Sequence, residues 1–88
     1  MKSHAIPRFW RLFHALPADA QRLAVKTFRL WQRNPNHPSL RYRRLANREN
    51  LVTVRIEDHY RALGLLETGV VEWIWIGTRA ECDQLVRG

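Results

Sequence analysis

The segment Asn34-Pro35-Asn36-His37-Pro38-Ser39 divides this chain of 88 residues into two halves of different character. Two prolines and two asparagines within six residues cannot continue a helix, so they predict an ordered turn. Apolar residues before the turn recur with helical spacing, whereas those after it fall in short stretches separated by turn residues. The chain therefore combines helices from its first half with a sheet from its second half. At this length we expect one domain over residues 1–88.

The first half predicts two helices joined by a short connection. An apolar stripe at i, i+3, i+4 and i+7 indicates the first helix: Phe9, Leu12, Phe13 and Leu16. A second stripe of the same kind lies within residues 18–33. Pro17 between the two stripes ends the first helix and is well suited to open the next. We expect these helices to form an αα-hairpin.

The second half predicts four short strands, over residues 40–45, 51–57, 60–66 and 70–76. The alternation of Val52, Val54 and Ile56 puts these three side chains on one face, and short turns between strands predict an antiparallel meander. Gly77 then breaks the last strand, and Thr78 can cap a final helix over residues 79–87. We expect an α+β fold in which the helical hairpin packs on one face of a small twisted antiparallel sheet, followed by a short C-terminal helix.

Two tryptophans in the last predicted strand bear on both packing and function. Trp73 and Trp75 lie two positions apart, so they should share one face, with Glu72, Ile74 and Ile76 on the other. On an open sheet such a pair would stack nucleic-acid bases. Under the helices it would be part of the core, which is the interpretation that we favour.

Positive charge is concentrated in the first half of the chain. The 15 Lys and Arg residues outnumber 8 Asp and Glu, which gives a formal net charge of +7. The net charge of residues 1–44 is +9, and that of residues 45–88 is −2. Thirteen of the fifteen basic residues are arginine, which binds phosphate bidentately and stacks on bases as lysine does not. This composition indicates a nucleic-acid partner or an acidic protein partner, with solvated helix faces as the alternative.

Composition also argues against several classes of protein. No apolar run approaches the roughly 20 residues of a membrane span, and no apolar signal segment is present, so we expect no membrane partner. Cys82 is the only cysteine, which excludes an intrachain disulfide and a zinc site with several cysteine ligands. The expected compartment is the reducing cytoplasm. Without a glycine-rich phosphate loop or clustered acids, we expect neither a cofactor nor a metal.

Arginines of the predicted sheet are the candidate site. Arg55 and Arg61 lie on neighbouring strands across a turn, and Arg79 follows the last strand. Side chains opposite one another in an antiparallel pair are close enough to act together. Guanidinium groups that converge in a concave sheet would bind a phosphodiester and stabilise the extra charge of a pentacoordinate transition state.

The alternative is that each of these arginines is paired with a local acid. Arg55 would then pair with Glu57 or Glu72, and Arg61 with Asp58. Such ion pairs would leave the sheet without a free anion site.

Two further groups are candidates for roles in the same site. Arg41 and Arg43 alternate onto one face of the first predicted strand, and we assign them, with Arg44, to substrate binding. His59 lies in the turn between the two central strands, where it could take a proton from a ribose 2′-hydroxyl. A solvated turn histidine is the alternative. Cys82 is expected to be a small, partly buried residue rather than a nucleophile.

Six segments together resemble a known family. They are the two helices, Asn34-Pro35-Asn36-His37-Pro38-Ser39-Leu40, Val54-Arg55-Ile56, Tyr60-Arg61-Ala62-Leu63-Gly64 and Trp73-Ile74-Trp75-Ile76-Gly77. Their order resembles the RelE/ParE toxin superfamily of bacterial toxin–antitoxin modules, over about Phe9 to Leu85. Members of that family have two helices on one side of a small antiparallel sheet. RelE-like members cut messenger RNA in the ribosomal A site without a metal, ParE-like members inhibit DNA gyrase, and a small antitoxin neutralises either kind.

The resemblance implies roles for individual residues. Arg55 and Arg61 match basic residues that grip the scissile phosphate, and Arg79 matches a basic residue after the glycine that ends the last strand. RelE-like sequences commonly have His where Arg79 stands and Tyr where Cys82 stands. Arginine cannot act as a general base, so His59 or the substrate itself would have to move the proton. The N-terminal residues look too short for the edge strand with which many members begin.

The leading hypothesis is therefore a RelE-like toxin, a ribosome-dependent and metal-independent mRNA endoribonuclease that inhibits translation. A ParE-like DNA gyrase inhibitor acting by binding is the second, and a catalytically degenerate member that binds RNA or antitoxin is the third. The expected partners are a cognate antitoxin, acidic in its toxin-binding segment, with mRNA and the ribosome, or alternatively DNA gyrase.

Overall fold

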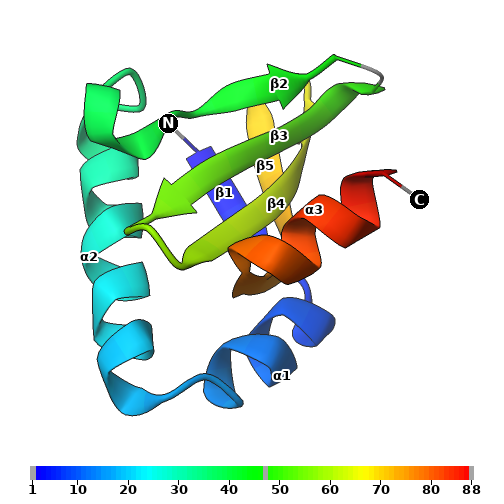
Figure 1. Cartoon of the computed structure of the whole chain (residues 1–88). Coiled ribbons are helices and arrows are strands. Elements are labelled where there is room, and N and C mark those ends of the chain that lie inside the picture. Colours follow the sequence, from blue (N-terminus) through cyan, green and yellow to red (C-terminus); the bar gives the residue numbers. More distant parts are fainter. Residues whose placement is uncertain (1, 47, 88) are drawn as a thin grey trace.

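The elements of the computed structural model, which describes residues 2–46 and 48–87, follow the predicted order with one additional strand at the start. Helix α2 stands along one side of the sheet, α1 lies below the sheet, and α3 lies on the side away from α2 (Figure 1). In chain order the elements are β1 (Lys2–Ala5), α1 (Pro7–His14), α2 (Ala18–Arg33), the 3-10 turn η1 (Pro38–Leu40), β2 (Arg43–Leu45), β3 (Arg48–Ile56), β4 (Tyr60–Glu67), β5 (Val70–Thr78) and α3 (Arg79–Arg87).

The sheet is mixed, with strand order β1-β5-β4-β3-β2. The three pairs formed by β2 to β5 are antiparallel, as predicted, but β1 pairs with β5 in parallel, from Lys2 opposite Val70 to Ala5 opposite Trp73. The expectation that the N-terminus is too short for an edge strand is therefore wrong. Four residues suffice because β1 pairs with only the first half of β5. Its side chains are mostly polar, so no hydropathy pattern marks it.

The first predicted strand, over residues 40–45, is shorter than expected. Pro38 and the two residues after it form the 3-10 turn, and His37 Nδ1 accepts a hydrogen bond from the Ser39 N–H (3.2 Å). Arg41 follows with φ of 45°, a left-handed conformation that a strand does not use. Only Arg43 to Leu45 pair with β3. Arg41 thus lies in the connection before β2 rather than in a strand.

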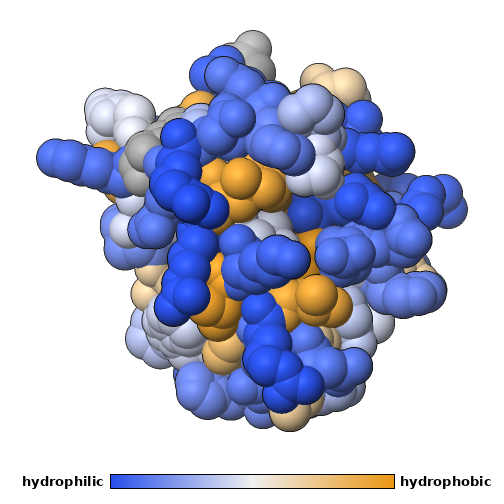
Figure 2. Space-filling model, turned by 90° about the vertical axis from the view of Figure 1, so that its left-hand side faces the viewer, coloured by the Kyte–Doolittle hydropathy of each residue, from blue (hydrophilic) through white to orange (hydrophobic). Residues whose placement is uncertain are grey.

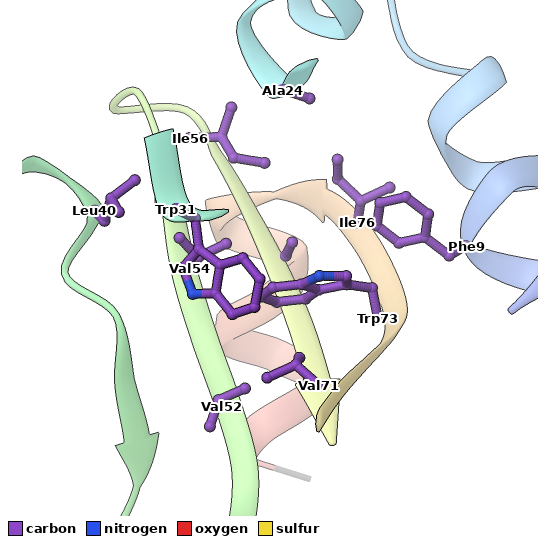
Figure 3. Packing of buried hydrophobic residues seen from close by; sticks show 11 residues of the cluster. Phe9, Ala24, Trp31, Leu40, Val52, Val54, Ile56, Val71, Trp73 and Ile76 are labelled. Atoms are coloured by element: carbon purple, nitrogen blue, oxygen red, sulfur yellow. The ribbon is translucent and has the colours of Figure 1, made fainter. Parts of the chain in front are cut away.

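The main core lies between the sheet and helices α1 and α2. Val52, Val54 and Ile56 all point to this side, which confirms the alternation predicted for β3 (Figure 3). Trp31 of α2 is fully buried, and its ring meets that of Trp73 edge to face, with the ring centroids 5.2 Å apart. The pair fills the centre of the cluster, so α2 is held to the sheet by large apolar side chains.

A β-bulge in β5 separates the two tryptophans that were expected to share a face. Ile74 is the extra residue between the paired positions Trp73 and Trp75, so the two-residue alternation shifts by one. Trp73 packs in the core under the helices, as predicted, whereas Trp75 packs beside Cys82 under α3. Gly64 opposite Trp73 leaves room for the indole, because a Cβ atom there would lie 2.9 Å from the Trp73 ring. The prediction that Trp73 and Trp75 share one face of the strand is therefore wrong.

Helix α3 begins with the cap that the sequence predicted. The Thr78 hydroxyl accepts from the Glu81 N–H (3.1 Å), and Glu81 Oε1 accepts from the Thr78 N–H (2.9 Å). This reciprocal pair is a capping box, which satisfies backbone donors at the helix start. The Arg79 N–H in addition donates to the carbonyl of His59 (2.8 Å). These bonds place α3 against the second face of the sheet.

We expect the capping box to make stability depend on pH. Its hydrogen bonds from Thr78 hold the pKa of Glu81 below the usual 4.5. A lowered pKa in the folded state stabilises the fold above the unfolded pKa, and the stabilisation is lost as pH falls through the folded value. Urea unfolding measured from about pH 7 down to pH 3 should therefore show a smaller acid-dependent loss in Glu81→Gln than in the wild type.

At neutral pH, Thr78→Ala should lower the free energy of unfolding by about 1 kcal/mol. The matched control is Glu67→Gln at the exposed end of β4, which should leave the acid-dependent loss as it is in the wild type. An unchanged pH profile in Glu81→Gln would contradict the stabilising role of the carboxylate.

Of the helices in the described part of the chain, none is long and apolar enough to cross a membrane.

Candidate functional site

A hollow of about 170 Å³ opens on the second face of the sheet, beside α3. Five arginines from different segments line it: Arg41, Arg43, Arg55, Arg61 and Arg79. We call this site the arginine hollow. The convergence of β3, β4 and α3 arginines, which the sequence predicted from their strand positions, is therefore present. Arg41 and Arg43 reach the same hollow from the connection before β2 and from β2 itself.

Arg55 is held in place by neighbours on both sides. It stands directly opposite Arg61 in the β3–β4 ladder, so both side chains leave the sheet on the same face. Arg55 Nη1 donates to the carbonyl of Ser39 (3.2 Å), and its Nη2 pairs with the carboxylate of Asp58. This hydrogen bond and the charge of Arg55 hold the pKa of Asp58 below its usual value. The guanidinium group thus has a fixed position before any ligand arrives.

Arg61 is partly buried in the hollow and is held by backbone groups. Its Nη1 donates to the backbone carbonyls of Glu57 (2.9 Å) and Tyr60 (2.7 Å). Burial, and then the charges of Arg79 and Arg55, lower its pKa, although a guanidinium group stays protonated at neutral pH. A partly desolvated cation among like charges is favourable for binding an anion, because an anion would relieve the repulsion.

The ion pairs that the sequence suggested as an alternative do not form. Arg55 pairs with Asp58 rather than with Glu57 or Glu72, and Arg61 contacts no described carboxylate. Among the side chains that the structure describes, four arginines of the hollow have no carboxylate partner: Arg41, Arg43, Arg61 and Arg79. The hollow therefore keeps most of its positive charge.

Two residues that the sequence did not single out also line the hollow. Asp83 is the one carboxylate among its described lining residues, and Thr53 lies beside Cys82. The spacing offered a signal in each case. Asp83 stands four positions after Arg79 in the predicted last helix, and Thr53 two positions before Arg55 in its strand.

Cys82 lies in the wall of the hollow and is buried. Burial, together with the nearby Asp83 carboxylate, raises the pKa of its thiol, while Arg61 and a hydrogen bond with Thr53 oppose the shift. The thiol is therefore protonated at neutral pH, which is what we expected of a small buried residue and not of a nucleophile.

Two of the predicted site residues lie outside the hollow. His59 is exposed in the β3–β4 turn, and only its carbonyl is tied to the site, through the Arg79 N–H. Arg44 pairs with Val52 in the ladder, so the alternation along β2 directs it away from the hollow that Arg43 enters. The structure thus brings together five of the seven predicted residues.

The hollow is equipped to hold a phosphodiester and to stabilise added negative charge on it. Asp83 is the carboxylate of its described lining, and a carboxylate is one of the groups that act as general bases in enzymes. Among the side chains that the structure describes, no three of His, Cys, Asp or Glu lie together in a way that would hold a metal ion.

No protein-family model matches this chain, and no curated protein sequence matches it. Solved structures do match. A chain of the RelB–RelE antitoxin–toxin complex from Methanococcus jannaschii superposes with a TM-score of 0.72 at 10% identity, covering 92% of this chain and 95% of that one. YafQ from E. coli gives a TM-score of 0.71 at 12% identity, and the superposition covers 92% of this chain and 96% of that one. The isolated E. coli RelE toxin gives a TM-score of 0.62 at 13% identity, and the superposition covers 98% of this chain and 96% of that one. The chain therefore has the fold of RelE-type toxins.

Proposed function

We propose, from the fold that it shares with RelE-type toxins, that this chain is the toxin of a type II toxin–antitoxin module and cleaves messenger RNA on the ribosome. The observation that carries the proposal is the arginine hollow, in which five guanidinium groups face one carboxylate. The shared fold supports the toxin class. The hollow supports the chemistry, because its charge and size suit a phosphodiester in RNA.

The reaction that suits this site is transfer of the phosphoryl group to the neighbouring ribose. The 2′-oxygen attacks phosphorus and forms a new P–O bond, while the bond to the 5′-oxygen of the next nucleotide breaks. The products are a 2′,3′-cyclic phosphate and a 5′-hydroxyl. The 2′-hydroxyl proton passes to a base, and the departing oxygen takes a proton from water. This step uses no external nucleophile.

The arginines would stabilise the charge that builds up on the phosphoryl oxygens. Arg61 is the main candidate because burial lowers its pKa, and an electrostatic contact is stronger away from water. Arg55 would hold the phosphate from the neighbouring strand, and Arg79 from the start of α3. Arg41 and Arg43 would contact the flanking substrate. We assign no contact to Arg44.

Asp83 is the better placed of two candidates for the base. It lines the hollow, whereas the His59 side chain lies outside the lining. Proton transfer requires hydrogen-bonding reach to the 2′-hydroxyl, and that requirement favours the residue inside the hollow. We therefore propose Asp83 in place of His59.

A second function is favoured by one observation. Arg79 and the protonated Cys82 thiol stand where the resembled nucleases commonly have His and Tyr, and neither can accept a proton. A protein with the same fold that binds DNA gyrase and performs no chemistry would need no such group. We keep gyrase inhibition as the alternative.

An antitoxin partner follows from the proposed module. The chain leaves Trp10 and Val25 exposed at 48% and 40%. They border an apolar hollow of about 300 Å³ between β1, α1 and α2, and Arg29 lies on the same rim. We propose that an acidic, apolar segment of the antitoxin covers this surface, because it matches both the charge of Arg29 and the exposed apolar side chains of Trp10 and Val25.

The proposed function predicts a specific pattern of products. Purified chain added to ribosomes carrying mRNA should cut the message and leave 2′,3′-cyclic phosphate ends, which can be identified by their resistance to ligation until the phosphate is removed. DNA supercoiling by gyrase should be unaffected in a parallel assay. Asp83→Asn should slow cleavage by about 10²- to 10⁴-fold, the usual contribution of general acid–base catalysis, and His59→Ala should cleave at close to the wild-type rate.

Two outcomes would contradict the proposal. Gyrase inhibition without RNA cleavage would favour the alternative function. If the chain arrests growth and co-expression of an acidic partner never relieves the arrest, the result would count against a toxin–antitoxin module. If His59→Ala abolished cleavage and Asp83→Asn did not, only the assignment of the base would be wrong.

A further inference from the structure

A second hollow, of about 260 Å³, lies between α2, the 3-10 turn and the end of β3. Its lining includes Arg55, which also lines the arginine hollow. The two hollows therefore adjoin, with the Arg55 side chain between them. No role in the proposed chemistry uses the second hollow.

The Arg55 side chain separates the two hollows and is hydrogen-bonded at both of its terminal nitrogens. Its Nη1 donates to the carbonyl of Ser39, and Ser39 itself lines the second hollow. Its Nη2 pairs with Asp58 in the turn that follows β3. These two contacts place the guanidinium group where it presents charge to ligands on either side.

The second hollow has a basic rim and an apolar floor. Lys26 and Arg33 line it from α2, where a spacing of seven residues puts them on the same face of the helix. Together with Arg55 they face one carboxylate, that of Glu57. Neither Lys26 nor Arg33 forms an ion pair with any side chain that the structure describes. Three leucines form the apolar part of its lining, namely Leu23 and Leu30, which are half-buried, and Leu40, which is buried. Figure 2 looks onto the side of the molecule on which α2 lies, and it shows hydrophilic side chains around exposed apolar surface.

We propose that this second hollow binds the nucleotide next to the scissile phosphate in the same RNA strand. Lys26 and Arg33 hold its phosphate, and the leucine floor lies under its base. The inference rests on the proposed function, since it takes RNA as the substrate. Two adjoining anion sites that share one arginine suit a chain of linked phosphates better than a single anion. An apolar floor under a basic rim suits a nucleotide, which has an apolar base and a charged phosphate.

The test measures binding without chemistry. An RNA of about ten nucleotides, with 2′-O-methyl groups to prevent cleavage, is titrated with each variant at several salt concentrations. For the pair of substitutions Lys26→Ala and Arg33→Ala, we expect affinity at low salt to fall by about tenfold. The slope of log K against log salt should become less steep by about 0.7 for the phosphate contact that is lost.

The matched control removes the same charge elsewhere. Arg8 and Arg11 are exposed on α1 and line neither hollow, so the pair Arg8→Ala and Arg11→Ala should keep the wild-type slope. Urea unfolding of each variant checks that both pairs are folded. An Asp- and Glu-rich peptide, titrated in parallel, tests whether the second hollow binds protein instead.

The outcomes separate this inference from the proposed function. The Lys26→Ala/Arg33→Ala variant could keep the RNA affinity and salt slope of the control variant while Arg61→Ala still weakens RNA binding. In that case the second site is wrong and the proposed function stands. If the wild type binds no free RNA, the second site is wrong, whereas the proposed cleavage on the ribosome is judged by the ribosome assay described above. If the Lys26/Arg33 pair weakens binding of the acidic peptide and leaves RNA binding unchanged, the second hollow is a protein-binding site and the inference is overturned.

Discussion

Replacing Arg61 with alanine should lower the rate of the proposed mRNA cleavage by about two to three orders of magnitude. The side chain lies directly opposite Arg55 and is partly buried between the charges of Arg55 and Arg79. Such a group acts on the charge that develops as phosphorus becomes pentacoordinate, so its loss should reduce kcat more than it raises KM. Single-turnover cleavage of mRNA on purified ribosomes would measure the effect.

Two variants distinguish lost chemistry from lost structure. Arg61 Nη1 also donates to the carbonyls of Glu57 and Tyr60, so Arg61→Ala should cost about 1 kcal/mol of unfolding free energy. Arg61→Lys keeps the charge but cannot form a bidentate contact, so it should recover part of the rate. A folded Arg61→Ala protein that cleaves at the wild-type rate would remove the arginine hollow from the mechanism.

Trp31→Ala should lower the free energy of unfolding by about 3–5 kcal/mol. Trp31 is fully buried, and its ring contacts Trp73 and Tyr42 edge to face, with centroids 5.2 and 5.7 Å away. Its removal leaves a cavity between α2 and the sheet that the surrounding rings cannot fill without moving. The free energy of unfolding of a whole domain is only about 5–15 kcal/mol. The variant should therefore be largely unfolded at moderate urea concentrations. Equilibrium unfolding in urea, followed by circular dichroism, measures the loss.

Trp10→Ala is the matched control, because Trp10 is 48% exposed. It contacts Phe9 and Phe13 only at ring edges, so its removal should cost about 1 kcal/mol or less. Trp31→Phe should be milder than Trp31→Ala, since the phenyl ring keeps much of the packing. It also removes an indole N–H that has no hydrogen-bond partner among the residues that the structure describes. Equal losses in Trp31→Ala and Trp10→Ala would contradict the central place of Trp31 in the core.

Local patterns in the sequence predicted a large part of the fold. The Asn/Pro turn, the apolar stripe of α2 and the alternation of Val52, Val54 and Ile56 all depend on neighbours within a few residues. The capping box of Thr78 with Glu81 is equally local. The position of Arg55 opposite Arg61 was predictable because a tight turn fixes the register of two adjacent strands.

The candidate site was predictable only in part. Adjacent strands indicated the pairing of Arg55 with Arg61, but the approach of Asp83 depends on how α3 packs across the sheet. The partner of Arg55 depended on the shape of the turn after β3, which selects Asp58 over Glu57. The place of the His59 side chain outside the hollow depends on the same turn.

What the sequence by itself determined is the three helices, the order of the elements after the N-terminus and the faces of β3, because these follow from periodicity and capping over a few residues. Only the tertiary structure decided that Lys2 to Ala5 pair with a strand almost seventy positions away, and that the bulge at Ile74 sends Trp73 and Trp75 to opposite faces. Both outcomes rest on backbone hydrogen bonds and packing between distant segments. Such contacts leave no periodic mark on the residues that make them.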